Sequence, residues 1–106
     1  MDTPLEVDVA TAAQHLREGA LMIDVREAFE VEAGAVAGTR HIPMRQIPEN
    51  LTELPRDRLI LVLCQVGARS LRVTQFLRAN GFEQVSNVAG GIVAWAEQID
   101  PSLPRY

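Results

Sequence analysis

Cysteine is the scarcest reactive residue in this sequence, because Cys64 is the only one among 106 residues. A lone cysteine forms no internal disulfide, and it cannot build a zinc or iron–sulfur site of several thiolates by itself. Free thiols persist in reducing compartments, so this cysteine usage predicts a cytoplasmic protein.

Long apolar runs and an excess of positive charge are also absent. No run approaches the roughly 20 apolar residues that a membrane span requires. The segment Met1–Pro4 has neither the basic nor the apolar part of a signal peptide. The net charge of −4 and the pI near 5.1 argue against non-specific binding of nucleic acid. We therefore expect neither a membrane nor a nucleic acid as a partner.

The composition that remains is that of one small globular domain. Apolar residues make up 47% of the chain and charged residues 23%, which suffices for a single buried core. We expect residues 1–106 to form one domain. The tail 101–106 carries two prolines and is expected to lie extended at the surface.

Expected strands and helices alternate along the chain. The apolar patterns predict five strands, at 5–7, 21–25, 39–42, 59–63 and 84–88. They predict helices after Asp8 up to Gly19 and at 28–33, 47–54, 70–80 and 92–98. Such alternation on short connections indicates a three-layer α/β domain, with a mainly parallel sheet of about five strands and helices on both faces.

The cysteine lies where the strongest of these strands ends. The run LILVL, from Leu59 to Leu63, leads directly into Cys64, and a helical pattern begins near Ser70. The thiol is therefore expected on a short loop at the carboxyl end of a central strand. Open α/β sheets hold their chemistry at that edge.

Four features of this loop favour the thiolate, which is the reactive form of cysteine. Gly67 allows the loop amides to turn inward and form an anion-binding nest. The following helix presents the positive end of its dipole. Arg69 adds a permanent charge with forked donors, and Ser70 is expected to cap the helix with its hydroxyl. A purely structural buried cysteine, the usual alternative, has no use for a loop closed by arginine.

The loop Cys64–Ser70 resembles the CxxGxRS active-site loop of rhodanese-type sulfurtransferases. Four more segments resemble pieces of that family's pattern, in the family's order: Leu21–Glu27 (LxxDVRE), His41–Pro43 (the end of NIP), Leu77–Val85 (LxxxGFxxV) and Val88–Trp95 (LxGGxxxW). Each piece is weak alone, whereas five in sequence form a specific pattern. The rhodanese-like fold of this family agrees with the α/β prediction.

The resemblance implies a two-step sulfur transfer. The Cys64 thiolate would attack the outer sulfur of a small anionic donor such as thiosulfate, release sulfite and become a persulfide. The sulfur would then pass to cyanide, a thiol or a protein, and no metal or organic cofactor would be needed. The backbone amides of the six residues after Cys64 would hold the charged sulfur: Gln65, Val66, Gly67, Ala68, Arg69 and Ser70.

The loop carries little charge for an anion site. Gln65, Val66 and Ala68 are uncharged, so Arg69 is the only cation of the loop. It would hold the loop and steer the donor. Because thiosulfate is a dianion, we expect modest affinity for it and leave room for a different natural donor.

Three polar residues near the expected edge have a supporting role in this interpretation. Asp24 and Arg26 end the second strand on the side of the loop. We favour a structural ion pair, and a second cation beside the pocket is the alternative role for Arg26. His41 ends another strand and is interpreted as structural, since a thiolate needs no histidine partner.

Two alternative functions remain open at the level of sequence. Phosphatases and arsenate reductases also use a thiolate in a loop closed by arginine, but the phosphatase pattern has five intervening residues. Here there are four, from Gln65 to Ala68, which suits a single sulfur better than a phosphoryl group. The other alternative is a non-catalytic binding module; inactive members of such families typically lose the cysteine.

Overall fold

The chain folds around one five-stranded parallel sheet, as the sequence predicts. The computed structural model describes residues 3–106, so Met1 and Asp2, half of the segment considered for a signal peptide, lie outside the described residues. The strands are β1 (Glu6–Val7), β2 (Leu21–Asp24), β3 (Arg40–His41), β4 (Ile60–Leu63) and β5 (Val85–Val88). Their order is β1-β5-β4-β2-β3, which places β4 in the centre.

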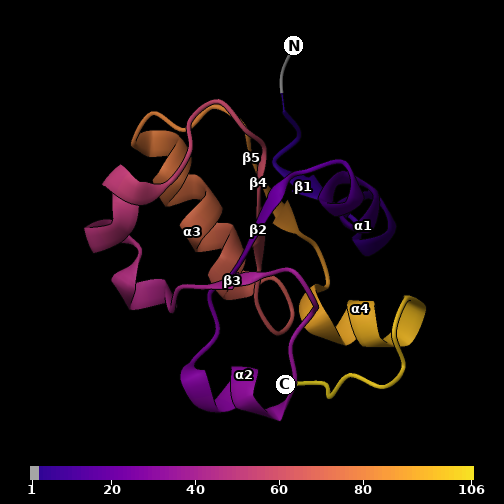
Figure 1. Cartoon of the computed structure of the whole chain (residues 1–106). Helices are drawn as coiled ribbons and strands as arrows, with labels where there is room; N and C mark the ends of the chain where they lie inside the picture. The colour runs from indigo at the N-terminus through magenta and orange to yellow at the C-terminus, as the bar shows by residue number, and fades with distance from the viewer. Residues whose placement is uncertain (1–2) are drawn as a thin grey trace.

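Helices cover both faces of the sheet (Figure 1). The α-helices are α1 (Val9–Arg17), α2 (Ala28–Ala33), α3 (Ala68–Ala79) and α4 (Gly91–Gln98). Two short 3-10 helices, η1 (Met44–Gln46) and η2 (Pro48–Glu53), join β3 to the chain before β4. Helices α1 and α4 lie on one face, and α3 lies with η1 and η2 on the other. The expected three-layer arrangement is confirmed.

The strands divide their side chains between two apolar clusters. Ile23 and Val62 pack in the cluster under α3, whereas Met22 and Leu61 pack in the cluster under α1 and α4. Successive residues of a strand point to opposite faces. A strand covered on both faces must therefore be apolar throughout, which explains the LILVL run. Trp95 of α4 is 4% exposed and packs in the cluster under α1 and α4.

Several helix boundaries differ from the prediction for local reasons. The segment 47–54 was expected to be one short α-helix, but its residues 48–53 form the 3-10 helix η2, which follows η1 after Ile47. Pro48 lacks an N–H group, so it cannot continue a regular α-helical ladder across this segment. Helix α3 begins at Ala68, two residues earlier than expected. The helix expected after Asp8 is present as α1, and the Asp8 side chain caps it by accepting a hydrogen bond from the Thr11 amide at 2.8 Å. None of the described helices has the length and apolarity needed to cross a membrane.

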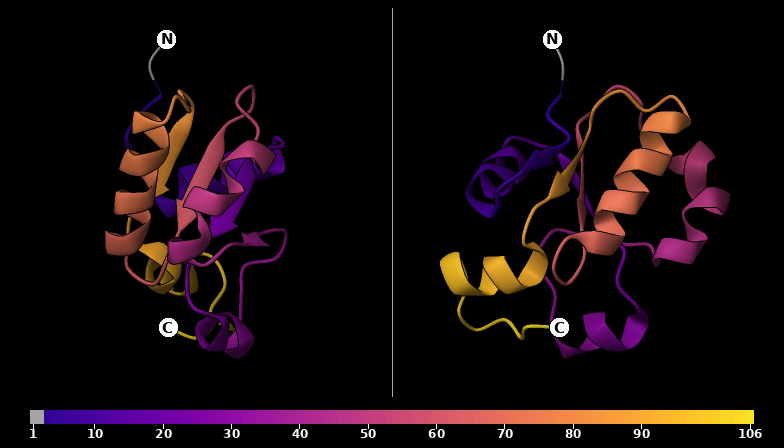
Figure 2. Two further views of the ribbon diagram at one scale, coloured as in Figure 1. Left: turned by 90° about the vertical axis from the view of Figure 1, so that its left-hand side faces the viewer. Right: turned by 180° about the vertical axis from the view of Figure 1, so that it is seen from behind.

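Parallel strands place all their carboxyl ends at one edge of the sheet, and the remaining elements gather there. Helix α2 lies beyond this edge, and the end of the chain lies beside it (Figures 1 and 2). The tail turns at 101–102 and then runs along the surface past Gly34. Pro104 lies so close to Gly34 that a β-carbon added to this glycine would be 3.0 Å from Pro104 Cγ. Leu103 packs against the apolar cluster under α1 and α4. The tail therefore lies against the edge that carries Cys64.

Candidate active site

Cys64 lies directly after β4, at the carboxyl edge of the central strand. Gly67 caps the following helix in a left-handed conformation, with φ at 108°. Glycine adopts this conformation without steric cost, and other residues rarely do. The chain thus turns from β4 into α3 over the four residues 64–67, and the loop wraps around the cysteine sulfur. This part of the sequence prediction matches the observed geometry.

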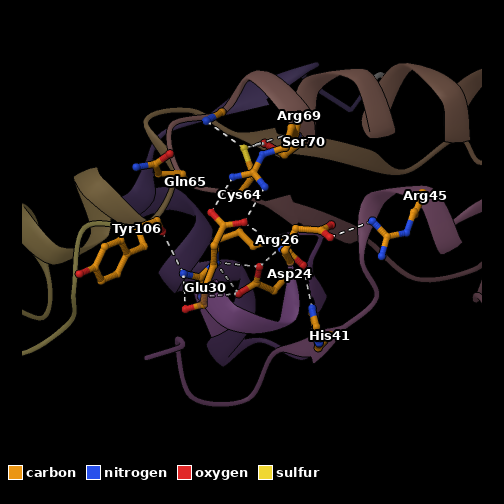
Figure 3. A network of polar contacts seen from close by, with 12 residues as sticks. Asp24, Arg26, Glu30, His41, Arg45, Cys64, Gln65, Arg69, Ser70 and Tyr106 are labelled. Atoms are coloured by element: carbon orange, nitrogen blue, oxygen red, sulfur yellow. Dashed lines mark hydrogen bonds and ion pairs between the residues drawn. The ribbon is translucent and has the colours of Figure 1, made fainter. Parts of the chain in front are cut away.

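Three donors converge on the sulfur atom of Cys64 (Figure 3). The amide of Gly67 lies 3.1 Å from Sγ, and the amide of Ser70 lies 3.4 Å from it. The Ser70 hydroxyl lies 3.2 Å from the same atom. Hydrogen-bond donors stabilise negative charge on sulfur, and the first turn of α3 adds its dipole. The environment of Cys64 therefore suits a thiolate, although the side chain is buried at 1% exposure.

The position of Ser70 corrects one expectation. Ser70 was expected to cap α3, but the helix begins earlier and Gly67 is its cap, without a side-chain hydrogen bond. Ser70 lies in the first turn, fully buried, and its hydroxyl points to the cysteine sulfur instead. In this structure its hydroxyl contacts the cysteine sulfur rather than the amides at the start of the helix.

Four further amides of the loop carry no intramolecular partner. The backbone N–H groups of Gln65, Val66, Ala68 and Arg69 make no hydrogen bond to a backbone carbonyl within residues 3–106. Amides at the start of a helix are the groups that bind anions in many proteins. The loop therefore offers these donors to a negatively charged group near the sulfur.

Helix α4 holds the loop in this conformation from behind. The Ile92 amide donates to the Cys64 carbonyl oxygen at 2.9 Å, and the Val93 amide donates to that of Gln65 at 3.1 Å. These two hydrogen bonds fix the backbone of Cys64 and Gln65 against the start of α4. A β-carbon on Gly91 would lie 2.5 Å from the Cys64 carbonyl oxygen, so only glycine allows this approach. Gly91 was not among the predicted site residues, because this contact joins segments about 26 residues apart in the sequence.

A buried asparagine fixes the loop from β5. Asn87 Nδ2 donates to the Gly67 carbonyl oxygen at 3.1 Å and to Glu6 Oε2 at 2.7 Å. Asn87 is fully buried, and its Oδ1 atom has no partner among the described residues. Asn87 was not among the predicted site residues. A polar side chain inside an otherwise apolar strand, VSNV, is the signal that points to it.

Arg69 does not project freely into the anion site. Its guanidinium forms a two-pronged ion pair with Glu30 of α2, with distances of 2.7 and 2.9 Å (Figure 3). The hydrogen bonds from Arg69 lower the pKa of Glu30 from 4.5 to about 2, and the same pair raises the pKa of Arg69. Glu30 was not among the predicted site residues, since 39 residues separate it from Arg69.

Asp24 and Arg26 form the expected ion pair, with Arg26 Nη2 lying 2.8 Å from Asp24 Oδ2. Both side chains are fully buried. The guanidinium also donates to the carbonyl oxygens of Gly34 at 2.9 Å and Tyr106 at 2.9 Å, so it joins β2 to α2 and to the tail. Because its donors are occupied and it is buried, the structure favours the structural role over a second cation in the pocket.

His41 and Gln65, two further predicted residues, both contact the main chain of other segments. His41 Nε2 lies 2.7 Å from the Arg26 carbonyl oxygen, so this ring contacts the backbone after β2. Gln65 Nε2 donates to the Arg105 carbonyl oxygen of the tail at 3.1 Å. Val66, at the tip of the loop, is 56% exposed. Within residues 3–106, no three His, Cys, Asp or Glu side chains are grouped as metal ligands would be.

A buried thiol in a loop of amides, at the carboxyl edge of a five-stranded parallel sheet, defines a class of protein. Residues 8–98 match the family model of the rhodanese-like domain. The chain belongs to the rhodanese-like domain family.

Relatives and solved structures agree with this assignment. The chain is 40% identical over 91 residues to the rhodanese-like/PpiC domain-containing protein 12 of Arabidopsis thaliana; the match covers 82% of the chain but 30% of that protein. It is 36% identical over 93 residues to a sulfurtransferase of Allochromatium vinosum, covering 86% and 87% of the two chains. A rhodanese-like domain protein of Staphylococcus aureus superposes with a TM-score of 0.80 at 30% identity, covering 100% of this chain and 99% of that one.

Proposed function

We propose that this protein is a sulfurtransferase that carries sulfur as a persulfide on Cys64. The observation that supports this most is the convergence of three donors on one buried sulfur atom. An inert core thiol gains nothing from two amides and a hydroxyl aimed at it. The Allochromatium vinosum relative, similar over nearly the full length of both chains, is named a sulfurtransferase.

The proposed reaction has two steps, each a displacement at sulfur. The Cys64 thiolate attacks the sulfane sulfur of a donor such as thiosulfate, so a new S–S bond forms and sulfite leaves with the electron pair of the broken bond. A thiophilic acceptor (cyanide, a thiol or a protein thiol) then removes the outer sulfur and regenerates the thiolate. Free amides of the loop hold the charge on the terminal sulfur. A covalent intermediate of this kind predicts ping-pong kinetics.

The cell compartment and the domain boundaries form part of the same proposal. A catalytic thiol that must stay reduced suits a reducing compartment such as the cytoplasm. The sheet and both apolar clusters use residues from β1 to α4, which supports one domain that works as a unit.

Steady-state kinetics with a sulfane donor and cyanide test the proposal. We expect parallel lines in double-reciprocal plots and no transfer by Cys64→Ser or Cys64→Ala, with the fold of both variants intact by circular dichroism. Transfer that persists in either variant would refute the mechanism. Phosphatase activity that disappears in Cys64→Ser, without transfer from any donor, would favour the phosphatase alternative instead.

A further inference from the structure

Glu30 balances the only positive charge of the cysteine loop. Arg69 donates one hydrogen bond from each terminal nitrogen to the two carboxylate oxygens of Glu30, and the Glu30 side chain is 9% exposed. A third hydrogen bond, from the Glu27 amide to Glu30 Oε1 at 2.9 Å, fixes this carboxylate at the start of α2. The pair is therefore built into the fold rather than formed by two mobile surface chains.

Other arginines at this edge are balanced in the same way. Arg26 is paired with Asp24 at 2.8 Å, and Arg45 is paired with Glu27 at 2.8 Å (Figure 3). Arg72, one turn farther along α3, lines a hollow on the flank of that helix rather than the loop. The anion site therefore relies on neutral amides and a neutralised guanidinium.

We propose that Glu30 determines which sulfur donor this site prefers, by cancelling the charge of Arg69. With Arg69 neutralised, a dianion such as thiosulfate gains little over a donor of low charge, so the site favours the persulfide of a small thiol. The inference rests on the proposed sulfur transfer and adds the charge class of its donor. Glu30 acts through Arg69 and is a specificity-determining residue, not a group that touches the reacting atoms.

Sulfur transfer from a small-thiol persulfide to Cys64 needs no additional oxidant or reductant. The Cys64 thiolate attacks the outer sulfur of a protonated persulfide, R–S–SH, and the new bond joins Cys64 Sγ to that sulfur. The S–S bond of the donor breaks, and the thiolate R–S⁻ leaves with its electron pair. Cys64 then carries –S–SH, and one negative charge is present before and after the step. Thiosulfate, by contrast, brings two charges into the loop next to the thiolate.

Glu30→Gln tests the inference because glutamine keeps the shape and one acceptor for Arg69 while it removes the charge. Transfer to cyanide is measured with thiosulfate and with cysteine persulfide as donors, at low and high salt. We expect KM for thiosulfate to fall about tenfold at low salt with kcat nearly unchanged, and this gain to shrink at high salt. The rate with cysteine persulfide is expected to stay within about twofold. Glu32→Gln, which removes an exposed carboxylate from the same helix, is the matched control and should change neither donor.

The outcomes separate this inference from the proposed function. A parallel loss with both donors in Glu30→Gln would overturn it, because a merely structural role for Glu30 predicts that pattern. An unchanged thiosulfate KM would overturn it as well. If the unmodified protein transfers sulfur from neither donor, the proposed function itself fails, and this is seen before any Glu30 variant is made.

Discussion

The side chain of Ser70 illustrates how one residue changes the meaning of a buried cysteine. Buried cysteines usually act as small apolar groups. Here the Ser70 hydroxyl and amide both approach the sulfur, and the residue is itself fully buried. Burial strengthens such polar interactions, because the local dielectric is lower than that of water. The site therefore combines a buried sulfur with hydrogen-bond donors that are already in place before the sulfur-donating substrate binds.

Ser70→Ala is expected to slow sulfur transfer while the fold is retained. Loss of one hydrogen bond to charged sulfur corresponds to about 1.5–3 kcal/mol, or roughly ten- to a hundredfold in rate. The measurement is kcat/KM for the first half-reaction, followed by sulfite release. Ser86→Ala is the control, since the Ser86 hydroxyl donates instead to the Pro4 carbonyl oxygen at 2.6 Å. Equal rates for Ser70→Ala and the unmodified protein would show that the hydroxyl does not assist the sulfur.

Glu30 also makes a prediction about stability and pH. Its pKa in the folded protein is about 2, below the usual 4.5, so the unfolded chain binds the proton more tightly. The stabilisation is fully present above pH 4.5 and is lost as the pH falls through about 2. We expect Glu30→Gln to lower the free energy of unfolding by about 1–2 kcal/mol at pH 7, less than the full linkage because solvent reaches Arg69.

Urea unfolding at several pH values measures this effect. The difference between the unmodified protein and Glu30→Gln should narrow across the window from pH 4.5 to pH 2, where the carboxylate takes up its proton. A difference of the same size at every pH would contradict the assigned role of the ion pair. Glu32→Gln again provides a variant with one exposed carboxylate removed.

At the scale of elements, the site depends on two helices, α3 and α4, whose first turns both contact the cysteine loop. Helix α3 supplies amides to the sulfur, and α4 binds the loop carbonyls so that these amides stay inward. The close approach of α4 is possible because Gly91 has no side chain and adopts φ of 58°. The loop geometry is therefore a property of the contact between α4 and the loop, not of the loop sequence alone.

Gly91→Ala is expected to disrupt this contact and abolish most sulfur transfer. The added methyl group would lie 2.5 Å from the Cys64 carbonyl oxygen, so α4 must shift away. We expect a loss of at least about 3 kcal/mol in stability, since overpacking adds to the cost of a positive φ. Gly19→Ala also places alanine at a positive φ, 104°, but no atom lies within 4 Å of the added carbon, so it reports a backbone cost without a steric clash. Equal losses for the two variants, measured by urea unfolding and transfer rate, would argue against the close contact.

At the scale of the whole molecule, the tail joins distant parts of the site. Residues 103–106 contact α2 through Gly34, the loop through Gln65 and the buried guanidinium of Arg26. The family match ends at residue 98, so these contacts are an addition to the matched region. The tail closes one side of the edge where α2, the loop and α4 meet.

Removing residues 103–106 is expected to destabilise the protein by about 2 kcal/mol. The loss combines the packing of Leu103 with an acceptor for the Arg26 guanidinium, which would be left partly unpaired. Thermal unfolding measures the change. The double variant Arg105→Ala, Tyr106→Ala keeps the backbone acceptors and should stay close to the unmodified protein. If it loses as much as the truncated chain, the side chains rather than the backbone contacts hold the tail.

Local features of this molecule could be predicted from the sequence, and distant ones could not. The strand before Cys64, the turn at Gly67 and the order of strands and helices follow from apolar periodicity and residue geometry over a few positions. The pairing of Arg69 with Glu30 spans 39 residues, and the contact of Arg26 with Tyr106 spans 80. Such partners depend on how elements pack. The cap expected at Ser70 was wrong because the left-handed Gly67 begins the helix one turn nearer to the cysteine.

Mass spectrometry of the intact protein after incubation with a sulfane donor tests the central claim most directly. We expect the protein to gain one sulfur atom, roughly 32 Da, on Cys64 as the covalent intermediate. A reductant should remove this mass, cyanide should remove it as thiocyanate, and Cys64→Ser should not acquire it. If the protein gains no mass from thiosulfate or cysteine persulfide, or if Cys64→Ser gains the same mass, Cys64 does not carry sulfur as a persulfide.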